Sequence, residues 1–97
     1  MPDFIQSTGD LAAGSDTANA NVLFFKGISL VDTTGDADVV VWKGGDNSGV
    51  ELARLQASDE NQTASLMLPG DTYIQCPEGI TYNVTGTSAI ANIYYKR

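Results

Sequence analysis

The chain has 97 residues, one cysteine and no histidine, and its 12 acidic residues outnumber its 5 Lys and Arg, which gives a formal net charge of −7. This length fits a single domain, and one thiol excludes an internal disulfide. Nucleic acids and anionic membranes attract clustered basic residues, so the acidic balance predicts neither as a partner. Because so small a core is marginal on its own, oligomerisation or docking onto a larger body is expected to support it.

The first 20 residues differ in composition from the rest of the chain. They are mostly small and polar, and their larger apolar side chains are Phe4, Ile5 and Leu11. Such a segment has too little apolar surface to fold alone, so residues 1–20 are predicted to form an extended N-terminal arm before a domain at residues 21–97. The segment lacks the basic start and apolar run of a secretory signal, which predicts synthesis in a cytoplasm.

From residue 21 onward, short apolar runs alternate with clusters of turn-forming residues. The runs are Val22–Val31, Val39–Lys43, Val50–Ala57, Thr63–Leu68, Thr72–Cys76, Ile80–Thr85 and Ala89–Tyr95. Short runs with turn signals at this spacing are typical of an all-β sandwich or barrel. Gly27 indicates a bulge at Lys26-Gly27 that divides the first run. The sequence therefore predicts one jelly-roll-like β-sandwich of about eight short antiparallel strands.

Period-two alternation supports several of these strands. Ile80, Tyr82 and Val84 fall on one face of their run, and the apolar residues of the last run also share a face. The segment Val50–Ser58 has residues that favour a helix, but it is short and lies between hairpin signals, so a strand is expected there. The facing of the first run, Val22–Val31, stays open.

The residue types needed for common catalytic and metal sites are missing from the sequence. Without histidine there is no Ser-His-Asp or Cys-His mechanism, and one cysteine cannot build a zinc or iron–sulfur site. Gly44–Gly49 has the glycines of a phosphate loop but no Lys-Ser/Thr after them. Asp32, Asp36 and Asp38 could bind calcium, although their spacing matches no EF-hand and a plain turn is favoured. No catalytic residue, cofactor or metal ligand is predicted, and the protein is expected not to be an enzyme.

Three places are apolar on both faces of a strand: Val39–Trp42, Phe24–Phe25 and Tyr94–Tyr95. Either both faces are covered within the monomer, or one face is covered by another subunit, where Trp and Tyr are enriched. The second interpretation predicts a homo-oligomer, with a trimer as the first expectation. The candidate interface residues are Phe4, Ile5, Leu11, Phe25, Val40, Trp42 and Tyr94.

About three-quarters of the chain, from Lys26 to Tyr95, resembles small virion proteins of tailed bacteriophages, in particular short-tailed phages of marine hosts. The segments that carry the resemblance are Lys26–Val31, Val39–Trp42, Gly45–Gly49, Leu66–Gly70, Gly79–Gly86 and Ile93–Tyr95. The turn at Asp32–Asp38 departs from the pattern. The resemblance implies a jelly-roll sandwich on the virion and supplies no catalytic residues.

The leading functional hypothesis is a capsid decoration (cement) protein made in the host cytoplasm. Its partners would be the major capsid protein or other virion proteins, and its arm would reach across neighbouring capsid subunits. A head–tail or fibre component is the related alternative. A carbohydrate-binding module is the alternative from another class, since jelly rolls often bind glycans through exposed aromatic side chains such as Trp42 and the tyrosines.

Overall fold

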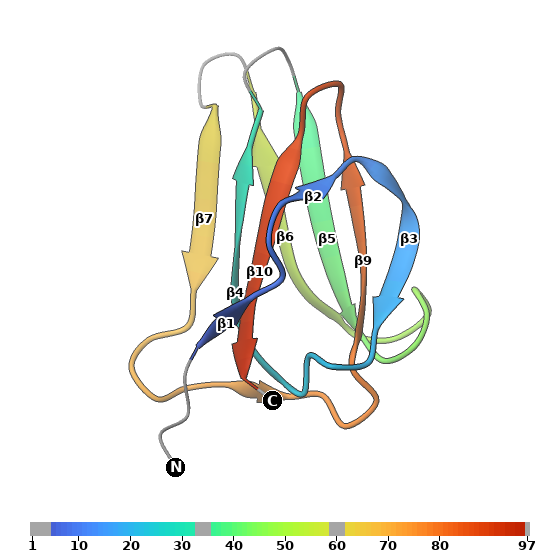
Figure 1. Ribbon diagram of the computed structural model, residues 1–97, viewed down its shortest axis with the longest axis vertical. Coiled ribbons are helices and arrows are strands. Elements are labelled where there is room, and N and C mark those ends of the chain that lie inside the picture. The colour runs from blue at the N-terminus through green and yellow to red at the C-terminus, as the bar shows by residue number, and fades with distance from the viewer. Residues whose placement is uncertain (1–4, 33–35, 59–61, 97) are drawn as a thin grey trace.

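Two antiparallel β-sheets pack face to face in the computed structural model, which describes residues 5–32, 36–58 and 62–96. The chain runs back and forth between the sheets, and its first and last described strands pair with each other (Figure 1). Throughout the described ranges no helix is formed, so none could cross a membrane. The all-β sandwich predicted from the sequence is confirmed.

Each sheet draws strands from the whole length of the chain. Sheet A contains β1 (Gln6–Ser7), β2 (Leu11–Ala12), β4 (Phe24–Val31), β7 (Thr63–Met67), β8 (Ile74–Gln75) and β10 (Ile90–Lys96). Sheet B contains β3 (Gly14–Asn19), β5 (Ala37–Lys43), β6 (Glu51–Ala57) and β9 (Ile80–Thr85). The segment with helix-favouring residues is strand β6, as expected, because packing overrides a weak local preference.

The connectivity is that of a jelly roll. Sheet A has the order β1-β10-β4-β7, with β2 also on β10 and β8 also on β4, and sheet B has the order β3-β9-β5-β6. Since β10 pairs with β4 on its other side, β1 and β2 form one interrupted edge, and β7 and β8 form the other. With each interrupted edge counted once, the described part of the chain has eight strands in two four-stranded sheets, the jelly-roll arrangement.

A β-bulge in β4 decides which side chains reach the core. Phe25 pairs with Tyr95 while Gly27 pairs with Tyr94, so Lys26 is an extra residue in β4. The bulge predicted at Lys26-Gly27 is thereby confirmed. It lets both Phe25 and Ile28 point inward although they are three positions apart, and both are fully buried. Without the extra residue, strict alternation would send one of them to the surface.

The core lies between the two sheets and consists mainly of medium-sized apolar side chains. Ile28, Leu30 and Ile93 come from sheet A, and residues such as Val39 and Ile80 face them from sheet B. Cys76 is also fully buried in this core, and burial raises the pKa of its thiol above the ordinary value. The cysteine is therefore a small apolar core residue, as predicted.

The N-terminal segment is part of both sheets. β1 and β2 pair with β10 of sheet A, and β3 pairs with β9 of sheet B through Gly14↔Val84 and Asn19↔Ile80. The segment is extended, as expected, but the expectation of an arm outside the sandwich is corrected, because its described residues supply one edge of each sheet. Edge strands need few apolar residues, since backbone hydrogen bonds hold them and only one side chain in two faces the core.

Removal of residues 1–20 should therefore destabilise the fold. Truncation would leave β9 and β10 with unpaired edges and remove the partly buried Leu11 from the core. We expect the melting temperature of residues 21–97 to fall by about 10 °C or more, which corresponds to roughly 2 kcal/mol for a domain of this size. Circular dichroism melting of the two chains measures it, and equal melting temperatures would show that the segment is a dispensable arm.

Candidate functional site

The predicted interface residues do not form one surface. Phe25 is fully buried, so its prediction as an interface residue is corrected: the β4 bulge turns its ring into the core. Leu11 is half-buried and packs against the core, whereas Ile5 is 49% exposed beside β1. Phe4 lies outside the described residues.

Val40 and Trp42 lie on the outer side of sheet B. Val39 and Val41 face the core, which sends Val40 and Trp42 of the same strand outward. Even so, Val40 is only 7% exposed, because the side chains of neighbouring strands cover it. For Val40, the interpretation that both faces are covered within the monomer is therefore correct. Trp42 is half-buried, and part of its ring stays accessible.

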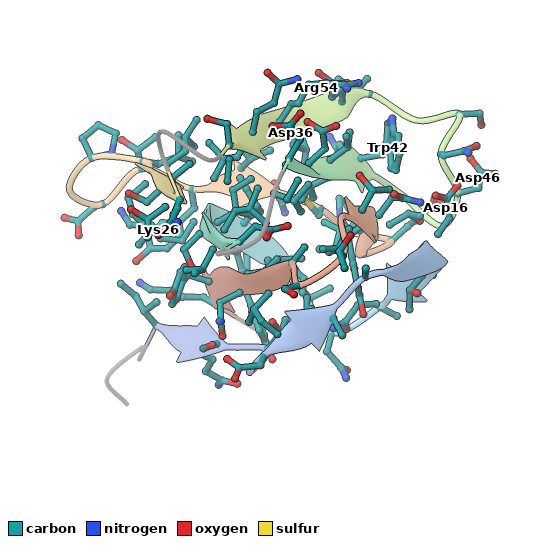
Figure 2. All side chains as sticks on the ribbon, turned by 90° about the horizontal axis from the view of Figure 1, so that it is seen from above. Asp16, Lys26, Asp36, Trp42, Asp46 and Arg54 are labelled. Carbon is teal, nitrogen blue, oxygen red and sulfur yellow. The ribbon has the colours of Figure 1, made fainter. Side chains whose placement is uncertain are left out.

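Polar side chains bonded to one another surround Trp42 on this outer side of sheet B, which we call the B face. Asp16 of β3 accepts hydrogen bonds from Asn83 of β9 and from Asn47 of the β5–β6 loop, both at 2.6 Å. On the other side, Arg54 forms an ion pair with Glu51 at 2.9 Å. This pair raises the pKa of Arg54 above its ordinary value. Figure 2 shows Asp16 and Asp46 near Trp42, with Lys26 on the opposite side of the molecule.

The outer side of sheet A, which we call the A face, is apolar at several positions. Val31 of β4 and Ile90 of β10 are directly paired and are 39% and 36% exposed. Nearer the other end, Met67 of β7 is 48% exposed and lies over Gly27, where a Cβ would collide with its sulfur. Tyr94 lies in the same row as Gly27, and its hydroxyl is 3.2 Å from Ser29 Oγ. Of the predicted residues, Tyr94 alone belongs to this group.

Sequence reasoning missed Val31, Ile90 and Met67 as surface candidates. Each is an apolar residue on the outer side of its strand, and this can be recognised only when it is known which side chains of β4 point outward. The bulge at Lys26 fixes that facing and the register of β10 and β7 against β4. Once it is placed, Val31 and Ile90 are outward because Leu30 and Ala91 point inward.

Charge is divided unequally between the two sheets. The strands of sheet A carry Lys26 and Lys96 and no acidic residue, although the chain has 12 acids. The strands of sheet B carry three acids, Asp16, Asp38 and Glu51, and two bases, Lys43 and Arg54. The strands of sheet A are therefore positively charged and those of sheet B slightly negative, although the Asp10 carboxylate in the β1–β2 loop accepts a hydrogen bond from Asn92 on the A face.

Lys26 binds the loop between β7 and β8 to sheet A. Its side chain is 4% exposed, and its Nζ donates hydrogen bonds to the backbone carbonyls of Gly70 and Thr72. The same ammonium lies 4.7 Å from the centre of the Tyr73 ring, and Lys96 Nζ lies 4.3 Å from it. Buried ammonium groups need such acceptors, and the aromatic ring adds cation–π attraction. The lysine thus has a structural role at the interrupted edge of sheet A.

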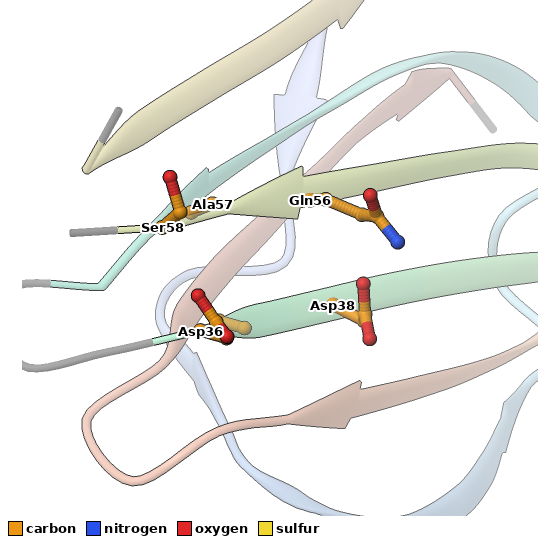
Figure 3. A pocket seen from close by; sticks show the side chains of 6 residues that line it. Asp36, Asp38, Gln56, Ala57 and Ser58 are labelled. Atoms are coloured by element: carbon orange, nitrogen blue, oxygen red, sulfur yellow. The ribbon is translucent and has the colours of Figure 1, made fainter. Parts of the chain in front are cut away.

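A pocket of about 480 Å³ opens between the ends of β5 and β6. Figure 3 shows Asp36 and Asp38 on one side and Gln56 and Ser58 on the other. Asp32 is fully buried beside Gly86, whereas Asp36 is exposed. The acids of the predicted turn therefore do not come together. Nowhere in the described ranges do three His, Cys, Asp or Glu side chains gather closely enough to hold a metal ion.

No protein-family model matches the chain, and no curated protein is significantly similar to it. The functional argument therefore depends on the geometry and chemistry of the two faces.

The role of Lys26 predicts a measurable loss when its charge is removed. Lys26→Met keeps the length of the side chain but deletes the bonds to Gly70 and Thr72 and the contact with Tyr73. We expect the free energy of unfolding to fall by about 1.5–3 kcal/mol, the usual value for hydrogen bonds to a charged group. Urea unfolding measures it. The matched control is Lys43→Met at an exposed position, which should change stability by less than about 0.5 kcal/mol; equal losses would contradict the role of Lys26.

Proposed function

We propose that this chain is a non-enzymatic virion structural protein that docks on the outer protein shell of a phage head as a decoration (cement) protein. The observation that carries the proposal is the apolar A face on a small acidic protein. Of the six large hydrophobic side chains that are exposed among the described residues, Val31, Met67 and Ile90 lie on the A face. Clusters of this kind on a soluble domain mark interaction surfaces.

The chemistry of the A face fits a protein surface better than a polyanion. Interface centres are poor in charge and rich in aromatic residues and Met, and their rims are polar. The A face supplies such residues in two rows, Val31 with Ile90 and Met67 with Tyr94, and Lys96 lies at one end of the face. A polar row of Ser29, Asn92 and Ser65 lies between the two. Docking through this side would leave the acidic B face in water, where mutual repulsion keeps decorated particles apart.

The jelly-roll fold and the resemblance to small phage virion proteins direct the proposal toward a viral shell. Jelly rolls occur in capsid and lectin domains, so the fold alone does not choose between them. A head–tail or fibre component would use the same docking chemistry at another place on the particle. The major capsid protein is the partner proposed first, because cement proteins act on the shell that it builds.

The carbohydrate-binding alternative depends on Trp42. An aromatic ring flanked by carboxylate and amide groups is typical of a sugar site, and the B face has both. However, Asp16 already accepts hydrogen bonds from Asn47 and Asn83, and a sugar would have to replace these bonds. The exposed apolar side chains of the A face, Val31, Ile90 and Met67, have no such bonds to replace, so protein docking is the better-supported proposal.

A charge placed on the A face should weaken attachment to the shell. Val31→Asp puts a carboxylate at an outward position and should reduce occupancy on shells that lack the protein by about tenfold or more, since it desolvates a charge within an apolar contact. The matched control is Val50→Asp, because Val50 is 69% exposed and lies outside sheet A. Occupancy is measured by co-sedimentation with shells. Equal binding of the two variants, with unchanged melting, would contradict docking through the A face.

A further inference from the structure

The four edges of the sandwich differ in how they are protected against pairing with another chain. Natural edge strands are kept apart by short length, charged residues, proline or bulges. In this fold, β1 and β2 have two residues each, β3 has an irregular register and contains Asp16, and β6 contains Glu51 and Arg54. Three of the four edges therefore carry at least one protective feature.

On the fourth edge β8 is also only two residues long, but β7 carries none of these features. Its five residues, Thr63–Met67, include no charge and no proline, and they pair with β4 in an unbroken register. Its two large side chains are both exposed: Leu66 on the core side is 36% exposed, and Met67 on the A face is 48% exposed. An edge strand that is regular, uncharged and apolar on both sides is expected to pair with a further strand.

The pairing of β7 with β4 shows which of its backbone N–H and C=O groups point away from β4 and could bond to another strand. Gln62 and Leu68 form hydrogen bonds with Asp32 and Lys26 of the neighbouring chain segment, on the β4 side. Because direction alternates along a strand, Ala64 and Leu66 also bond to β4, whereas Thr63, Ser65 and Met67 point their N–H and C=O groups outward. All three outward residues are exposed, and β7 ends the strand order of sheet A in the described part of the chain.

We infer that β7 is a dimerisation edge that pairs antiparallel with β7 of a second copy of this chain, about a two-fold axis at Ser65. A two-fold axis makes the two strands antiparallel and places each residue opposite its symmetry mate. Ser65 then faces Ser65 of the second copy, and Thr63 faces Met67. Each copy contributes the N–H and C=O groups of its three outward residues, and each donor meets an acceptor.

A second copy is the occupant that the chemistry of β7 favours. Leu66 would face Ala64 of the second copy, so both exposed apolar residues of the strand lose contact with water. Within β7 no like charges come together, which matters for two molecules that each carry a net charge of −7. A two-fold dimer differs from the trimer that the sequence first suggested, so the number of subunits tests the inference.

Charge substitutions at the two-fold axis give a specific test. Ser65→Lys and Ser65→Glu each place like charges opposite one another in the dimer but only on an exposed site in the monomer. In analytical ultracentrifugation we expect the full chain to be a dimer at micromolar concentration. The dissociation constant of the dimer should be at least about tenfold higher for each variant. An equimolar mixture of the two variants should recover the dimer, because Lys then faces Glu.

The control is Ser7→Lys, which adds the same charge on the A face at the opposite edge of sheet A and should dimerise like the parent chain. Melting curves establish that each variant is folded. If the Ser65 variants do not fold, the double variant Thr63→Lys, Met67→Lys is used instead, because it also places like charges opposite one another in the dimer. A monomeric or trimeric parent chain, or variants that dimerise unchanged, would overturn the inference. The free protein is measured, so this outcome is independent of attachment to shells.

Discussion

The extra residue in β4 is the constraint on which the two sheets depend. β4 lies at the centre of sheet A and pairs with β10 on one side and with β7 and β8 on the other. Lys26 shifts its alternation by one position, so that Phe25, Ile28 and Leu30 all enter the core. The lysine that causes the shift also uses its ammonium to hold the loop between β7 and β8 through Gly70 and Thr72. Lys26 thus determines which side chains of β4 enter the core, and it also holds the loop that interrupts this edge of sheet A.

The same register determines which side chains are exposed on sheet A. With Leu30 and Ala91 inward, Val31 and Ile90 are outward and adjacent on the A face, while the acids of sheet B lie on the other side. Docking through the A face and pairing through β7 are compatible, because the first uses side chains perpendicular to the sheet and the second uses the backbone at its edge. A β7 dimer would extend the A face over two molecules, so that weak contacts of each copy with a repetitive shell act together.

The sequence predicts the sandwich well because turn residues and apolar runs are local signals. Each strand from β4 to β10 overlaps a predicted run, although β5 begins before its run and β10 ends after its run, and the glycine beside Lys26 marks the bulge. Other features depend on pairing between distant segments. The polar N-terminal residues look unable to fold because their stabilising partners, β9 and β10, lie more than 60 residues away. Likewise, Phe25 and Val40 look like interface residues until the bulge and the neighbouring strands show that they are covered.

The account depends most on the claim that the A face, and not the B face, meets the shell. Hydroxyl-radical footprinting tests it directly, since Tyr94 and Met67 report on the A face and Trp42, the only tryptophan, reports on the B face. Oxidation of each residue is compared by mass spectrometry between free and shell-bound protein. The account predicts that Tyr94 and Met67 become protected on the shell while the labelling of Trp42 is unchanged. Protection of Trp42 with continued labelling of Tyr94 and Met67 would contradict it.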